Sequence, residues 1–209
     1  LHMKLKLIYP DVPFWRVEMS RLALFFGGIE FEDLRPSREE IAKMKTDGTF
    51  PFGQFPVLQV DGKTIAQTGA IARFCGKLSG LYPFKDEFAA AKVDEVIDLA
   101  TDITNQMRPA LMEKDPKLRI EMRRELSKTI LPRWLGFLEK LLQDNGDTGF
   151  FVGHSISVAD LAVWRLCAWI SGGIIDGLPV NLLDGFPLLS VHQSQISNLP
   201  KVVEWIKKH

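Results

Sequence analysis

Residues 54–73 read QFPVLQVDGKTIAQTGAIAR, and this stretch decides how the first part of the chain folds. A strand is predicted over 56–60, a two-residue hairpin turn at Asp61-Gly62, and the returning strand over 64–66. Apolar residues at helical spacing then predict a helix over 68–78. The stretch therefore supplies a pair of strands and a helix that follows them directly.

The preceding residues extend this pattern toward the N-terminus. The segment 4–9, KLKLIY, alternates polar and apolar residues as a strand does, and 29–34 alternates again. Helices are predicted over 16–26, which Gly27-Gly28 ends, and from Pro36-Ser37 to about residue 45. The order β-α-β-α-β-β-α predicts an α/β domain with one mixed four-stranded sheet covered by helices.

The pattern changes near residue 85, because nothing from Phe88 onward looks like a strand. Apolar residues recur at spacings of three and four from Val93 to Leu111, which predicts a long helix. A second long helix is predicted over 118–142, and three shorter ones over 157–170, 188–196 and 201–207. We therefore expect an α/β domain over residues 1–82 and an all-helical domain over 83–209.

The composition indicates an ordinary globular protein, with 46% apolar and 25% charged residues among 209. Its 26 Lys and Arg balance 26 Asp and Glu, which gives no support for nucleic acid as a partner. No apolar run approaches the ~20 residues of a membrane span, and Leu1-His2-Met3-Lys4 lacks a signal peptide's apolar core. Cys75 and Cys167 lie far apart in the sequence, so we expect neither disulfides nor a metal site. Two scattered cysteines fit a reducing compartment, and we expect a cytoplasmic protein.

Four stretches carry a resemblance to a known family. They are Gln54-Phe55-Pro56-Val57-Leu58, residues 67–73, Ser157-Val158-Ala159-Asp160, and Tyr9 followed by Arg16-Val17-Glu18. Together with the domain order they resemble the cytosolic glutathione transferases, and the last stretch is similar to the tyrosine-dependent sigma class. The resemblance implies a thioredoxin-like first domain, glutathione as co-substrate and a role in detoxification. In the family, the Ser157–Asp160 capping box serves folding.

Two of these stretches imply residues that bind glutathione. In the family Pro56 is cis, so the backbone of Phe55, after Gln54, pairs with the cysteine of glutathione; alone, Pro56 would be an ordinary strand-leading proline. Gln67 and Thr68 hold the γ-glutamyl carboxylate, with Thr68 in place of the family's Ser. Thr68 also suits an N-cap, whose first-turn amides attract an anion, and by itself it would be only a cap.

Tyr9 is the residue that the resemblance assigns to catalysis. A free thiol has a pKa of about 8.5, and a phenol proton directed at the sulfur stabilises the thiolate. The alternative is a strand-end aromatic whose hydroxyl lies in water. Arg16 either orients the thiolate or the loop, or is an exposed arginine paired with Glu18.

Two further charged residues are assigned by analogy. Lys45 is a candidate for the glycine carboxylate of glutathione, or else a solvated lysine. In sigma-like enzymes an acid at the place of Asp102 binds the γ-glutamyl ammonium held by the other subunit, which implies a two-fold homodimer.

The chain departs from the family pattern at three points. The loop 10–15 is one residue longer than expected, Ile41 or a neighbour stands where sigma enzymes often place a Trp, and Pro109 stands where prostaglandin D synthases carry a Trp. We expect a pocket for small hydrophobic electrophiles between the domains. Its predicted walls are Phe14, Trp15, Thr104, Asn105, Met107 and Arg108. Peroxidase and isomerase side activities stay open.

Two other functions compete with this interpretation. A thiol-redox relative needs a cysteine at the start of the first helix, and residues 11–16 contain none. A non-catalytic use of the fold, as a crystallin-like protein, a ligand carrier or an assembly module, remains the alternative, because fold alone does not establish function.

Overall fold

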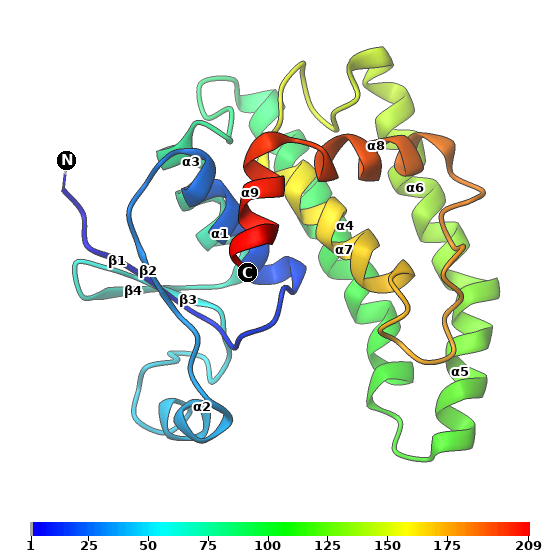
Figure 1. The fold of residues 1–209 in the computed structure, drawn as a ribbon, viewed down its shortest axis with the longest axis horizontal. Coiled ribbons are helices and arrows are strands. Elements are labelled where there is room, and N and C mark those ends of the chain that lie inside the picture. The colour runs from blue at the N-terminus through cyan, green and yellow to red at the C-terminus, as the bar shows by residue number, and fades with distance from the viewer. Residues whose placement is uncertain (1) are drawn as a thin grey trace.

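A computed structural model describes residues 2–209, so Leu1, the first residue of the expected α/β domain, lies outside the described part. The N-terminal domain runs β1 (Leu5–Ile8), α1 (Trp15–Phe26), β2 (Glu32–Leu34), α2 (Arg38–Met44), β3 (Val57–Val60), β4 (Lys63–Ala66) and α3 (Thr68–Ser79). The helical domain follows with α4 (Glu87–Met112), α5 (Pro116–Lys128), α6 (Ile130–Asp144), a 3-10 turn (Gly146–Thr148), α7 (Val158–Ser171), α8 (Pro187–Ser197) and α9 (Pro200–Lys208). Figure 1 shows the two domains side by side. The predicted fold class is confirmed.

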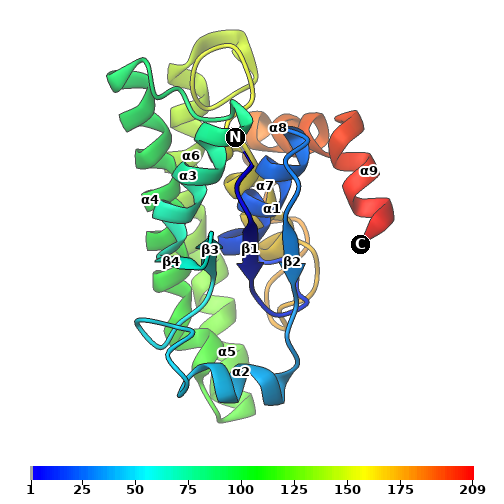
Figure 2. The same cartoon turned by 90° about the vertical axis from the view of Figure 1, so that its left-hand side faces the viewer.

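The sheet has the order β2-β1-β3-β4, as Figure 2 shows face-on. β1 pairs in parallel with β2 and antiparallel with β3, with Leu7 opposite Leu58. The hairpin turn is the predicted one: Asp61 and Gly62 have φ of 49° and 82°, the two positive values that a tight turn between twisted strands requires. α2 lies beyond the end of the sheet toward which β1 and β2 point (Figure 2).

α1 joins the two domains, because it packs on α3 on one side and on α7 on the other. One continuous apolar core runs from Leu7 in the sheet through Leu22 in α1 to Leu161 in α7. α9 folds back onto α1, although the two helices lie at opposite ends of the chain (Figure 1). The two domains therefore share one apolar core.

The capping box at the start of α7 is present as predicted. The Ser157 hydroxyl accepts from the N–H of Ala159 at 3.2 Å, and the Asp160 carboxylate accepts from the N–H of Ser157 at 2.9 Å. Asp160 is fully buried and also contacts the N–H of Phe151 at 3.0 Å and His192 Nε2 at 2.9 Å. The box therefore fastens both the preceding loop and α8 to the start of α7.

The single long helix predicted over 118–142 is wrong, because α5 ends at Lys128 and α6 begins at Ile130. Thr129 lies between them with φ −120° and ψ −72°, outside helical geometry. Pro132 explains the break: it has no N–H to give to the carbonyl of residue 128, and its ring would clash with that carbonyl.

Among the described residues, no helix combines the length and apolar character that crossing a membrane requires.

Candidate active site between the two domains

A cleft with a cavity of about 360 Å³ lies where the loop after β1 meets α4 and α7. Its lining includes five of the predicted ligand residues, namely Tyr9, Arg16, Lys45, Gln54 and Phe55. A smaller side pocket adjoins it and is lined by Arg16, Phe52, Gln54, Phe55, Pro56, Ala66, Gln67 and Thr68. The cleft and the side pocket share three residues, so the structure brings together every predicted site residue except Asp102.

Tyr9 follows β1 directly and is 8% exposed, so most of its ring is buried. Its N–H donates to the carbonyl of Leu34 at 3.2 Å, and its ring packs edge-on against Phe55 with centroids 5.2 Å apart. Burial raises the pKa of the Tyr9 phenol above its ordinary value of 10.0, although the positive charges of Arg16 and Arg21 act to lower it. The phenol is therefore neutral near pH 7 and has a proton to donate.

Arg16 lies in the first turn of α1 and lines both the cleft and the side pocket. The alternative of an exposed Arg16 paired with Glu18 is wrong, because Glu18 is 2% exposed and pairs with Arg21 and Arg165. Burial lowers the pKa of Arg16; Tyr9 acts to raise it, and the positive charge of Arg108 acts to lower it further. Two arginines that repel each other across a cleft favour an anion between them.

The bond between Phe55 and Pro56 is cis, as the resemblance implies. Within residues 2–209, the backbone N–H and carbonyl of Phe55 make no hydrogen bond to the rest of the chain. Phe55 lies two residues before Val57, where the paired part of β3 begins. Its two backbone groups are thus available to a ligand that binds as an extra short strand.

The prediction of Thr68 as N-cap of α3 is wrong: Gln67 is the N-cap, and Thr68 is the first helical residue. Gln67 has φ 81°, a left-handed conformation that is uncommon for a side chain other than glycine and that costs free energy. No side chain caps this helix end, so its first amides are left to water or to an anion. Thr68, with its hydroxyl, lies at this start of α3 and lines the side pocket.

Lys45 and Asp102 differ in their relation to the cleft. Lys45 is the C-cap of α2, lines the cleft and is exposed to solvent, with its ammonium 5.9 Å from the Phe55 ring centroid. Asp102 is exposed on α4 and lines neither pocket. Within one chain, Asp102 therefore has no part in the site.

Four of the six predicted walls line the cleft: Phe14, Thr104, Asn105 and Arg108. The prediction of Trp15 and Met107 as walls is wrong, since both are completely buried in the core. The Trp15 indole instead donates to the hydroxyl of Thr104 at 2.9 Å and ties α1 to α4. Because Met107 lies four residues after Ile103, it shares the core-facing side of α4 with that residue.

Trp169 is a wall that the sequence interpretation missed, together with Gly53, Leu111 and Met112. Its ring meets Phe14 edge-on with centroids 4.9 Å apart. A second cavity, of about 420 Å³, lies against the same pair of rings and is lined also by Tyr9, Val12, Pro13, Arg165, Ala168 and Ile174. The sequence did contain a signal for Trp169. Trp169 lies four residues after Arg165, the charged residue that interrupts the apolar run of α7, so the two side chains share one face of the helix.

The two thiols lie away from this chemistry. Cys75 and Cys167 are buried, and burial raises the pKa of each to about 12. Neither thiol lines the cleft or the side pocket, so the site has no thiolate of its own. In the described part of the chain, no three His, Cys, Asp or Glu side chains are grouped to hold a metal ion.

Comparison with known proteins adds two matching family models. The model described as Glutathione S-transferase, N-terminal domain, matches residues 5–76, and the model for the C-terminal domain matches residues 101–209. Probable glutathione S-transferase 7 of Caenorhabditis elegans is 33% identical over 195 residues, which are 91% of this chain and 89% of that protein.

Solved structures match nearly the whole chain. Monomeric Na-GST-3, a glutathione S-transferase of Necator americanus, superposes with a TM-score of 0.83 at 32% identity and covers 99% of this chain and 97% of its own. Prostaglandin synthase D of Nilaparvata lugens superposes with a TM-score of 0.85 at 27% identity and covers 99% of this chain and 98% of its own.

Proposed function

This chain belongs to the glutathione S-transferase family, and on that premise we propose that Tyr9 activates the thiol of glutathione for attack on small hydrophobic electrophiles. The observation that supports this most is the buried, neutral phenol of Tyr9 in a cleft that also holds Arg16. A phenol in this state donates a hydrogen bond to a thiolate without competing for its charge. Tyr9 therefore acts as a donor and not as a general base.

The energy required is within reach of one contact. Lowering a thiol pKa by about two units needs about 2.7 kcal/mol of preference for the anion. A hydrogen bond to a charged partner contributes about 1.5–3 kcal/mol. Arg16 adds favourable charge at the same place, and Arg108 faces the cleft as well.

The rest of glutathione extends from the cleft into the side pocket in this proposal. The backbone of Phe55, between Gln54 and Pro56, pairs with the cysteine. Gln67, Thr68 and the uncapped amides of α3 hold the γ-glutamyl carboxylate. Lys45 at the cleft's rim is suited to the glycine carboxylate.

The electrophile occupies the apolar part of the cleft, against Phe14, Leu111, Met112 and Trp169. A cavity of about 360 Å³ suits a compact molecule, at the lower end of ligand pockets. The likeness to prostaglandin synthase D favours prostanoid isomerisation as a second candidate activity. Pro109 lines a different cavity, between α4 and α5, and so offers that reaction no group in the cleft.

We further propose a sigma-like cytoplasmic homodimer, with the domain boundary at residues 82 and 83. Asp102 is solvent-exposed on α4 and lies outside its own site, as a residue serving the partner's site would. A carboxylate there offsets the cost of holding the γ-glutamyl ammonium out of water. The alternative function is a non-catalytic ligand carrier or crystallin-like protein with the same fold.

Retention on immobilised glutathione, followed by conjugation of a chlorinated nitrobenzene, tests the proposal. We expect Tyr9→Phe to keep binding glutathione and to lose about 10- to 100-fold in kcat/KM near pH 6.5, the factor expected if the thiol pKa rises by one to two units. Tyr82→Phe is the matched control, because the Tyr82 hydroxyl donates to Asp94 at 3.1 Å, outside the cleft. Binding without turnover in the wild type would favour the carrier, and equal activity of Tyr9→Phe would refute the role of Tyr9.

A further inference from the structure

The backbone carbonyls of the turn that presents Tyr9 are held by the side chain of Arg21, while Arg35 pairs with the Asp11 carboxylate at the outside of the same turn. β1 ends at Ile8 and α1 begins at Trp15, so the turn contains no regular structure of its own. Arg21 Nη2 donates to the carbonyls of Tyr9 and Pro10, each at 3.3 Å, and Nη1 donates to the carbonyl of Val12 at 3.0 Å. Three carbonyls of the turn therefore converge on one guanidinium.

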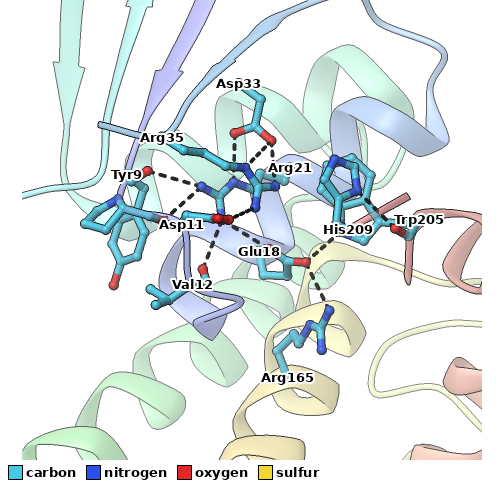
Figure 3. Close-up of polar contacts among 11 residues, drawn as sticks. Tyr9, Asp11, Val12, Glu18, Arg21, Asp33, Arg35, Arg165, Trp205 and His209 are labelled. Atoms are coloured by element: carbon cyan, nitrogen blue, oxygen red, sulfur yellow. Dashed lines mark hydrogen bonds and ion pairs between the residues drawn. The ribbon is translucent and has the colours of Figure 1, made fainter. Parts of the chain in front are cut away.

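Arg21 is itself completely buried and uses all its donor positions. Its Nε donates to Asp33 of β2 at 2.9 Å, and Nη1 also reaches Glu18 at 3.4 Å. Figure 3 shows the guanidinium between these carboxylates and the turn, with the Tyr9 phenol oxygen directed away from the cluster. Because all its donors are engaged, the guanidinium is held in one orientation, and the turn carbonyls bound to it are held in one position.

Glu18 is the more deeply buried of the two carboxylates that pair with this arginine, and its position depends on two other helices. At 2% exposure it accepts from Trp205 Nε1 of α9 at 2.6 Å and from Arg165 Nη2 of α7 at 3.1 Å. The three donors around Glu18 come from α1, α7 and α9 (Figure 3). A buried carboxylate keeps one position only while its hydrogen bonds are complete.

We infer that the C-terminal helix α9 positions the Tyr9 hydroxyl, with Trp205 holding Glu18, Glu18 holding Arg21, and Arg21 holding the turn from Tyr9 to Val12. Trp205 and Glu18 are positioning residues and touch neither substrate. The inference rests on the proposed role of Tyr9. It also accounts for how a turn with two prolines and an extra residue keeps a defined shape.

Trp205→Phe tests the inference, because it keeps most of the ring packing and removes the indole N–H. We expect the apparent thiol pKa in the pH profile of kcat/KM to rise by about half a unit, which is about threefold lower activity below that pKa. Above the pKa, activity should return to the wild-type plateau. Arg165→Met removes another donor to Glu18 and should shift the profile in the same direction, whether or not Trp205→Phe folds well.

Trp164→Phe is the matched control. Trp164 is 3% exposed, like Trp205, and its Nε1 donates to Ser197 of α8 at 2.8 Å and not to Glu18. Arg165 lies 4.4 Å from the Trp164 ring centroid, and phenylalanine keeps an aromatic ring at that place. It should lower thermal stability and leave the pH profile unchanged. A wild-type profile in both Trp205→Phe and Arg165→Met would overturn the inference.

Tyr9→Phe, measured in parallel, separates the two proposals. If Tyr9→Phe raises the thiol pKa while Trp205→Phe and Arg165→Met do not, only the inference about α9 fails. If Tyr9→Phe itself leaves the thiol pKa unchanged, the proposed function of Tyr9 fails and the inference fails with it.

Discussion

At the scale of single residues, the two tyrosines of the chain, Tyr9 and Tyr82, allow a prediction of how folding stability depends on pH. Burial raises the pKa of both phenols above 10.0, and the negative charge of Asp94 adds to the effect at Tyr82. Below pH 10 both phenols are neutral in the folded and in the unfolded chain. As the pH rises past 10, the unfolded chain ionises first, so stability falls until the folded pKa values are passed.

We therefore expect phenolate absorbance to appear only above pH 10 in the folded protein, and earlier in the unfolded protein. Conjugation should not lose its phenol donor between pH 7 and about 10. An ultraviolet titration of wild type and Tyr82→Phe checks this, since the variant reports Tyr9 alone. A phenolate signal from Tyr9 below pH 9 would contradict the predicted direction of its shift.

At the scale of elements, two capping boxes within residues 2–209 can be compared. Ser37 and Glu40 cap α2 at the exposed surface, whereas Ser157 and Asp160 cap α7 in the core. Ser37→Ala should cost about 1 kcal/mol of folding free energy. Asp160→Asn should cost about 3 kcal/mol, because the carboxylate also serves Phe151 and His192 without access to water.

Urea unfolding of both variants at one fixed protein concentration measures this difference, since association would otherwise shift the apparent stability. The α7 variant should lose more stability, and its refolding yield should fall as well. Equal costs in the two helices would show that burial does not strengthen the α7 box.

At the scale of the whole molecule, the proposed role of Asp102 requires two chains. Asp102→Asn should raise the KM for glutathione about tenfold, the loss expected for a hydrogen bond to a charged group, and leave the thiol pKa unchanged. Asp98→Asn is the control, because Asp98 is exposed one turn earlier on the same helix. Sedimentation of the wild type should show a dimer under the assay conditions.

A monomer would match the similar Necator americanus structure, which is described as monomeric. A fully active monomer, with Asp102→Asn indistinguishable from Asp98→Asn, would remove Asp102 from the site. The proposal for Tyr9 would be untouched, because the cleft is formed within one chain.

The sequence by itself determined the parts of this protein that depend on neighbours along the chain. Periodicity predicted every strand and most helices, Asp61-Gly62 predicted its turn, and Ser157 with Asp160 predicted the cap of α7. The cis bond before Pro56 was expected from the resemblance because the motif from Gln54 to Pro56 is local. Thr129 was missed, although Pro132, which breaks the helix there, is visible in the sequence.

Only the tertiary structure decided what depends on residues far apart. Trp15 is buried because Thr104, 89 positions later, accepts its indole proton. Glu18 meets Arg165 and Trp205, 147 and 187 positions away, and is therefore unavailable to Arg16. Spacing along a helix says which side chains share a face, but the partner of that face is chosen by packing, where each buried polar group must find the donors that replace water.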